Sequence, residues 1–182
     1  ILFLTLSFDS NAQNDKIVRK GLISTSLTIS PSYMFSDKQS YSYIDGKLEG
    51  YISEKLSFSG EAFFYTGNIS SDSSVFSYNH SVFYGALCHT TNRNSDLYFG
   101  LQPGFAFTKL SAENNKLTAT HVGVNPLVAP VLGFNFFLAK YFHFFIQSQL
   151  IVGQHNFDVH KSLTELRFSA GLGLNVNSLK AE

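Results

Sequence analysis

Apolar and small polar residues alternate along most of this chain, between residues 21 and 177. In the first alternating segment, Ile23, Leu27 and Tyr33 belong to one set, and Ser24 and Ser30 belong to the other. Successive side chains of a β-strand point to opposite faces, so the pattern predicts a strand with one apolar and one polar face. The segment spans about 14 residues, whereas strands of globular proteins average about 5–6. The chain is therefore expected to form unusually long, two-faced strands.

We expect eight such strands, and the connections between them alternate in length. The strands are predicted at about 21–35, 41–53, 57–66, 78–90, 96–109, 125–138, 142–156 and 164–177. The connections after the second, fourth and sixth strands are short, and the others are longer on average and rich in Ser, Asn and Asp. This arrangement is typical of an up-and-down antiparallel barrel, in which an even number of strands places both chain ends at the short-turn end. The predicted fold class is therefore all-β.

The composition of the two faces indicates which of them points inward. The polar face carries mostly Ser, Thr, Gly, Gln and Asn, which suit the narrow lumen of an eight-stranded barrel. The other face carries large apolar side chains, such as Phe99, Leu101, Phe134 and Ile146, which suit lipid. Because a closed barrel also satisfies its backbone groups within hydrocarbon, the pattern predicts a transmembrane β-barrel. Pro103 and Pro130 fall inside predicted strands, where each removes one backbone donor.

Aromatic residues gather near both ends of the predicted strands, where a membrane barrel carries its interface girdles. The girdle predicted at the long-loop end contains Tyr33, Phe35, Tyr41, Tyr43, Phe64, Tyr65 and Tyr78. The girdle predicted at the short-turn end contains Tyr51, Phe58, Tyr98, Phe99, Phe136, Phe137, Tyr141 and Phe142. A soluble sandwich with aromatic core residues is the alternative interpretation, and the length of the strands counts against it.

Charge and cysteine content narrow the possible functions. The 182 residues carry 13 Lys and Arg against 13 Asp and Glu, and charged residues make up 14% of the chain. A neutral chain lacks the basic excess that nucleic-acid binding requires. A charged fraction this low falls short of the roughly 25–35% that suits a fully solvated surface. The single Cys88 excludes a disulfide framework within the chain and a multi-cysteine metal site.

The N-terminal segment resembles a processing signal. Residues 1–8 are largely apolar, and the sequence Ser-Asn-Ala-Gln follows at residues 10–13. We predict a signal peptide over 1–12 whose charged n-region is missing, and cleavage after Ala12. A first apolar strand is the alternative. The expected divisions are then a periplasmic tail over 13–20, the barrel over 21–177 and a C-terminal tail over 178–182. The cleavage sequence resembles those of exported Bacteroidota proteins.

The chain resembles the small eight-stranded outer-membrane barrels of the OmpA, OmpX and OmpW kind. The resemblance rests on the eight alternating strands and the signal-like start, and covers about residues 15–177. It implies a location in the outer membrane of a Gram-negative cell and contact with lipid and lipopolysaccharide. The chain departs from these barrels at its end, because it finishes Asn-Ser-Leu-Lys-Ala-Glu, where such barrels commonly carry a terminal aromatic residue.

Charged residues on the predicted lumen face are few. We expect them to form one structural charge cluster in the lumen, made of Asp45, Lys47, Glu49, Glu61 and Arg167. A tight turn that pairs Ser53 with Ser57 would place Glu49 opposite Glu61. Two adjacent carboxylates repel each other unless a cation lies between them or one keeps a proton. The cluster can therefore be a salt-bridge plug, which we favour, with Arg167 reaching the two glutamates across the lumen, or a gate or acid/base pair.

One other group of residues gives weak evidence of a catalytic site. His160, Ser162 and Glu165 lie close together in the sequence and could form a hydrolase triad, but triads depend on geometry and loop polarity explains these residues equally well. We expect no catalytic residues, metal or cofactor. The predicted function is a non-enzymatic outer-membrane barrel with a filled lumen, which acts as a structural or accessory subunit, or as an anchor, and binds a protein partner in a larger complex. The alternatives are a hydrolase that modifies lipid A and a soluble barrel that carries a small apolar ligand.

Overall fold

The computed structural model describes residue 18 and residues 20–70, 75–111, 121–156 and 161–178. The predicted signal peptide over 1–12 lies outside the described residues, as do most of the two predicted tails. These boundaries therefore stay predictions. No helix among the described residues is long and apolar enough to cross a membrane.

Eight long antiparallel strands make up the described part of the chain, as the alternating pattern predicts. A two-residue strand, β8, is added at one end. The strands are β1 (Leu22–Met34), β2 (Gln39–Tyr51), β3 (Leu56–Asn68), β4 (Phe76–Asn92), β5 (Ser95–Leu110), β6 (Gly123–Ala139), β7 (Phe142–His155), β8 (Lys161–Ser162) and β9 (Glu165–Asn177). Each predicted segment corresponds to one long strand, and the ends differ by a few residues.

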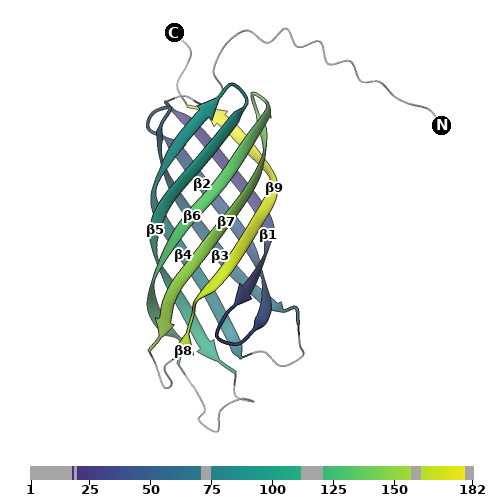
Figure 1. The fold of residues 1–182 in the computed structure, drawn as a ribbon, viewed down its shortest axis with the longest axis vertical. Helices are drawn as coiled ribbons and strands as arrows, with labels where there is room; N and C mark the ends of the chain where they lie inside the picture. Colours follow the sequence, from purple (N-terminus) through teal and green to yellow (C-terminus); the bar gives the residue numbers. More distant parts are fainter. Residues whose placement is uncertain (1–17, 19, 71–74, 112–120, 157–160, 179–182) are drawn as a thin grey trace, which may run out of the picture.

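The strands close into a barrel. Their order is β6-β5-β4-β3-β2-β1-β9-β7, and β6 also pairs with β7, so that the eight long strands form a complete ring. All of these pairings are antiparallel. Figure 1 shows the long strands tilted relative to the long axis of the barrel. The small β8 pairs with the end of β7 through Gln154 and His155.

Short turns lie at one end of the barrel, between β2 and β3, β4 and β5, and β6 and β7. In the first of these turns the backbone N–H groups of Ile52 and Ser53 both donate to the carbonyl of Leu56, at 2.9 and 3.0 Å. The start of β1 and the end of β9 lie at this same end (Figure 1), where Ser178 N–H donates to the Gly21 carbonyl at 2.9 Å. The first long strand therefore starts, and the last one ends, at the short-turn end, as predicted.

The apolar face points outward and the polar face points inward. On β5, Leu101 is 60% exposed, whereas the next residue, Gln102, is fully buried. Phe99, Leu132 and Ile146 are likewise more than half exposed. The alternation predicted from the sequence is therefore confirmed, with the lumen lined by polar side chains and the outer wall by apolar ones.

The predicted aromatic girdles are wrong for six of their members: the five residues named next, and Tyr65, which is partly buried and packs against Tyr41 and Tyr43. Tyr41, Tyr43, Tyr51, Tyr98 and Phe137 are at most 3% exposed and point into the lumen. The reason is the two-residue period of a strand, which sends adjacent aromatic residues to opposite faces. Tyr98 therefore points inward while its neighbour Phe99 points outward, and end position along a strand alone does not make an aromatic residue part of a girdle.

Pro103 and Pro130 both face outward, and the residue pairing is interrupted beside each of them. Between β4 and β5 the paired residues skip from Phe83↔Gly104 to Leu87↔Gly100. Between β6 and β7 they skip from Val128↔Val152 to Val131↔Gln149. A proline has no N–H to donate, so a local gap in the ladder is the expected result. The barrel accommodates both prolines without losing a strand.

Candidate functional site in the barrel lumen

The five charged residues predicted to face the lumen all point into it. Their side chains belong to strands β2, β3 and β9, and each residue is at most 8% exposed. The residues are Asp45, Lys47, Glu49, Glu61 and Arg167. Charged side chains are rarely buried to this extent unless they are paired or hydrogen-bonded. Their contacts therefore determine what the lumen can do.

The predicted register of the β2–β3 hairpin is wrong by two residues. Lys47 lies opposite Glu61, and Glu49 lies opposite Ser59. The loop between the strands is longer than predicted, because the last pair before it is Tyr51↔Ser57. A shift by an even number of residues leaves every side chain on its predicted face. It also replaces the predicted pair of facing carboxylates with two residues of opposite charge.

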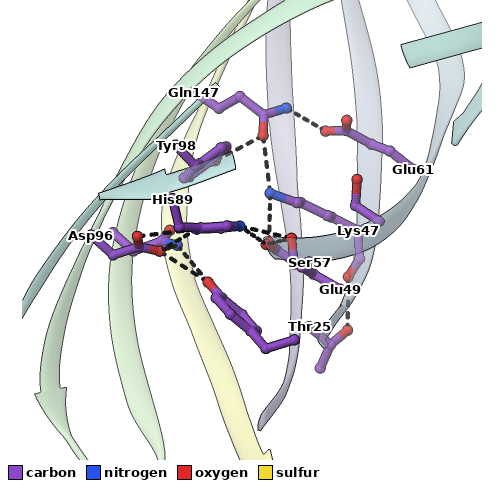
Figure 2. Close-up of polar contacts among 12 residues, drawn as sticks. Thr25, Lys47, Glu49, Ser57, Glu61, His89, Asp96, Tyr98 and Gln147 are labelled. Carbon is purple, nitrogen blue, oxygen red and sulfur yellow. Dashed lines mark hydrogen bonds and ion pairs between the residues drawn. The ribbon is translucent and has the colours of Figure 1, made fainter. Parts of the chain in front are cut away.

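A chain of alternating charges crosses the lumen near the short-turn end (Figure 2). Lys47 Nζ lies 3.0 Å from Glu49 Oε2. Glu49 Oε1 lies 3.1 Å from His89 Nε2, and Asp96 Oδ2 lies 2.9 Å from His89 Nδ1. A carboxylate at each ring nitrogen suits a doubly protonated imidazole that donates on both sides. Tyr51 contributes to the same network by donating its hydroxyl hydrogen to Asp96 Oδ2 at 3.0 Å.

Ser57, His89 and Asp96 have the spacing of a serine-hydrolase triad, but their surroundings differ from one. Ser57 Oγ lies 2.7 Å from His89 Nε2, and His89 Nδ1 faces Asp96. In a working triad, the ring nitrogen facing the serine must accept the hydroxyl proton. Here Glu49 faces that nitrogen and also accepts a hydrogen bond from Ser57 Oγ at 2.6 Å. Ser57 is also fully buried, so the arrangement favours an ion-paired network over an activated nucleophile.

Arg167 forms a second cluster nearer the loop end. Its Nε donates to Glu165 Oε1 at 3.1 Å, its Nη2 contacts the same oxygen, and its Nη1 donates to Ser81 Oγ at 2.7 Å. The guanidinium also lies over the rings of Tyr43 and Phe63, at 3.9 and 4.4 Å from their centroids. The expected ion pairing of Arg167 with Glu49 and Glu61 is therefore wrong. Glu165, which is two residues away on the same strand, forms the ion pair with the guanidinium instead.

Asp45 and Glu61 lie between these two clusters. Ser30 Oγ donates to Asp45 Oδ2 at 3.3 Å, and Gln147 Nε2 donates to Glu61 Oε1 at 2.6 Å. The carbonyl oxygen of the same glutamine accepts hydrogen bonds from Lys47 and Tyr98. Figure 2 shows Gln147 reaching across the lumen between Glu61 on one side and Lys47 on the other. Neither carboxylate has an ion pair with Lys or Arg within the described residues.

Apolar side chains fill both ends of the lumen. A cluster at the loop end includes Met34, Tyr41, Phe76, Leu110 and Leu163. A smaller cluster at the short-turn end contains Val18, Leu22, Tyr51 and Phe137. Between them, a void of about 10 Å³ is lined by polar groups that include Lys47, Glu49 and Tyr98. Such a volume holds about one water molecule. The part of the lumen that the structure describes is therefore filled by side chains.

The predicted histidine–serine–acid set is not brought together within the described residues. His160 lies outside them. Glu165 is buried against Arg167, whereas Ser162 is exposed on β8 and donates to Thr164 Oγ1 at 3.0 Å. His89 and Asp96 are not among the site residues predicted from the sequence. Both lie at inward positions of β4 and β5, so the alternation of inward and outward residues along these strands would have identified them as lumen residues. Among the described residues, no three His, Cys, Asp or Glu side chains form a group that could hold a metal ion.

Comparison with known proteins supports the fold at low sequence identity. No family model matches the chain, and neither does any curated protein. The chain is similar to the crystal structure of the outer membrane protein OprG from Pseudomonas aeruginosa, with a TM-score of 0.64, 13% identity, and coverage of 90% of this chain and 100% of that one. It is also similar to Neisserial surface protein A, with a TM-score of 0.63, 11% identity, and coverage of 87% and 97%.

The attachment invasion locus protein Ail of Yersinia pestis, in complex with a heparin analogue, gives a TM-score of 0.59 at 17% identity, with coverage of 86% and 99%. Identities this low establish similarity of fold and no more. The chain has the closed eight-stranded antiparallel fold of small outer-membrane barrels, in agreement with the resemblance derived from its sequence.

Proposed function

We propose that this chain is an outer-membrane protein that acts as a structural or accessory subunit, or as an anchor, and binds a protein partner within the membrane or at its surface. The proposal rests on the apolar composition of the outer wall. Large apolar side chains cover it along all eight long strands, and many are 40–70% exposed. A solvated monomer rarely exposes contiguous apolar area of this extent, whereas lipid favours it.

The filled lumen supports a non-enzymatic, non-conducting role. Apolar clusters occupy both ends, and hydrogen-bonded charges occupy the space between them. A lumen filled in this way offers no aqueous path through the interior that the structure describes. The surfaces left for recognition are therefore the outer wall, the loops and the ends of the chain.

Location is tested first, by separating outer membrane, inner membrane and soluble periplasm after expression with the native N-terminal segment. The protein is expected in the outer membrane, with a mature chain that starts at Gln13. Its band should also migrate differently on unheated and heated gels, because a closed barrel resists unfolding by detergent. Recovery in the soluble periplasm, or a mature chain that keeps residues 1–12, would contradict the proposal.

The partner is tested by cross-linking from single cysteines. Cys88 is the natural cysteine and lies exposed on the outer wall. In a Cys88→Ala background, a photoactivated cross-linker is placed at Leu101→Cys on the wall and at Lys38→Cys at the loop end. A partner should give one discrete protein adduct from at least one position, and the Cys88→Ala parent should give none. Lipid adducts alone from both positions would argue against a partner bound in the membrane or at this surface.

A further inference from the structure

Among the described residues, two buried carboxylates in the lumen form no ion pair with Lys, Arg or His. Five of the described acidic side chains are buried there, and three groups that can carry positive charge contact acidic residues: Lys47, His89 and Arg167. Each of the three is engaged with Glu49, Asp96 or Glu165. Asp45 and Glu61 are the carboxylates left over. An unpaired buried carboxylate is strongly disfavoured, so these two require neutralisation from another source.

The two carboxylates lie close together on the lumen face of the β2–β3 hairpin. Asp45 is opposite Phe63 in the β2–β3 ladder, and Glu61 is two residues from Phe63 on the same face, so the two acids are diagonal neighbours. Diagonal neighbours lie about 7–8 Å apart along the backbone, within reach of long side chains.

The hydrogen-bond partners of the two acids also lead to adjacent residues. Asp45 is linked through Ser30 to Ser169, and Glu61 is linked to Gln147. Ser169 and Gln147 are themselves directly opposite each other in the β7–β9 ladder. The hydrogen bonds of Asp45 and Glu61 therefore lead to two residues that face each other on the neighbouring strands β9 and β7.

Each carboxylate keeps one oxygen without a hydrogen bond. The unpartnered atoms are Asp45 Oδ1 and Glu61 Oε2, in residues that are 2% and 4% exposed. A third unpartnered oxygen, Gln149 Oε1, belongs to the inward residue that follows Gln147 on β7 and is 1% exposed. Buried oxygens usually accept at least one hydrogen bond, so each of these three oxygens lacks a partner that it would normally have.

We propose that Asp45 and Glu61 bind one divalent metal cation of the hard, oxygen-binding class, with Gln149 Oε1 as a further ligand. Two carboxylate oxygens and an amide oxygen are donors that Ca²⁺ and Mg²⁺ take, whereas zinc and copper favour histidine and cysteine. A cation ligated directly at about 2.0–2.6 Å needs little more room than a water molecule. Its two charges balance the two carboxylates that Lys47, His89 and Arg167 leave unpaired.

Metal binding to the full-length, detergent-purified protein tests the proposal. After treatment with a chelator and its removal, CaCl₂ or MgCl₂ is titrated at constant ionic strength, and binding is measured by equilibrium dialysis. One ion should bind per chain, and NaCl at the same ionic strength should not displace it. Asp45→Asn and Glu61→Gln should each weaken binding at least tenfold. Glu54→Gln removes the same charge from the exposed turn between β2 and β3 and should leave binding unchanged.

Thermal unfolding of the double variant Asp45→Asn with Glu61→Gln is a second test, which does not depend on the single variants. Without divalent metal, the double variant should unfold at a higher temperature than the parent, because repulsion is removed. Added Ca²⁺ should raise the midpoint of the parent and leave that of the double variant unchanged. The proposal is overturned if the parent binds neither metal, if both variants bind as tightly as the parent, or if lowering the pH alone stabilises the parent while metal has no effect. The last result would mean that protons neutralise the two acids.

Discussion

The Arg167→Met substitution tests whether the arginine cluster stabilises the barrel through Glu165. Arg167 is 1% exposed, and its guanidinium makes its ion pair with Glu165 and a hydrogen bond to Ser81. Methionine keeps part of the packing against the rings of Tyr43 and Phe63 but removes the charge and every donor. Glu165 then stays buried without a cation, although Tyr43 still donates to its Oε2 at 3.2 Å.

The expected loss is large for a single substitution. Removing one partner of a buried ion pair costs about 3–5 kcal/mol. The unsatisfied Ser81 hydroxyl adds to this, and the remaining hydrogen bond from Tyr43 subtracts from it, so we expect a decrease of about 3–4 kcal/mol in the free energy of unfolding. Glu165→Gln with Arg167→Met should recover at least about 1 kcal/mol, because the buried charge disappears together with its partner.

The assay is reversible urea unfolding in lipid vesicles. It is followed by tyrosine fluorescence, because the chain has no tryptophan, and by the shift between folded and unfolded bands on a gel. Glu61→Gln with Arg167→Met is the matched control, since it removes an acid that does not pair with Arg167. A parent-like stability of Arg167→Met, within about 0.5 kcal/mol, would refute the reasoning. Each recovery is measured after subtracting the effect of Glu61→Gln or Glu165→Gln alone in the parent. Equal recovery by the two changes would mean that Arg167 is shared across the lumen.

Two further substitutions test the outer wall and the charge chain near the short turns. Leu101→Arg should lower the free energy of unfolding in vesicles by about 2–4 kcal/mol if Leu101 lies near the bilayer midplane. Leu101→Phe should stay within about 0.5 kcal/mol of the parent. Equal losses from the two substitutions would mean that this face does not contact lipid. His89→Leu should cost about 3 kcal/mol or more, because it leaves Glu49 and Asp96 facing each other without the ring between them. A neutral effect of His89→Leu would show that the two carboxylates take up other partners.

The fold could be predicted from the sequence because its strands obey a simple period. Alternation with a period of two, sustained over eight long segments, fixes which side chains share a face whatever the exact pairing. Leu101 and Gln102 are therefore placed correctly without any structural information. The same rule places Tyr98 inside and Phe99 outside, because the position of a residue along the period decides its face even where aromatic residues cluster at a strand end.

The contacts inside the lumen could not be predicted in the same way. The pairing of Glu49 with Ser59 depends on the length of one hairpin loop. The sequence around Glu54 does not determine that length. Contacts across the barrel, such as Gln147 with Glu61, depend on the stagger of strands that are far apart in the chain. Arg167 had a nearer acid available two residues away, and two residues on one strand always share a face. The spacing of Glu165 and Arg167 in the sequence therefore already indicates this ion pair.

Two glycines provide a final test of how tightly the interior is packed. A Cβ at Gly133 on β6 would overlap the ring of Tyr98, its partner on β5, whereas a Cβ at Gly60 on the outer wall of β3 would meet nothing within 4 Å. The Tyr98 ring cannot turn aside freely, because its hydroxyl donates to Gln147 at 2.8 Å and Lys47 Nζ lies 4.2 Å from the ring centroid.

We therefore expect Gly133→Ala to lower the free energy of unfolding by about 1–3 kcal/mol through overpacking. Gly60→Ala should raise it by about 0.4–1 kcal/mol, because alanine restricts the unfolded chain and fits the strand. Both are measured by urea unfolding in vesicles. Tyr98→Leu combined with Gly133→Ala should recover part of the loss relative to the sum of the single changes, since the shorter side chain leaves room for the methyl group. Equal effects of the two alanines would mean that the Tyr98 ring yields at little cost, and that the lumen at this level is looser than its hydrogen bonds imply.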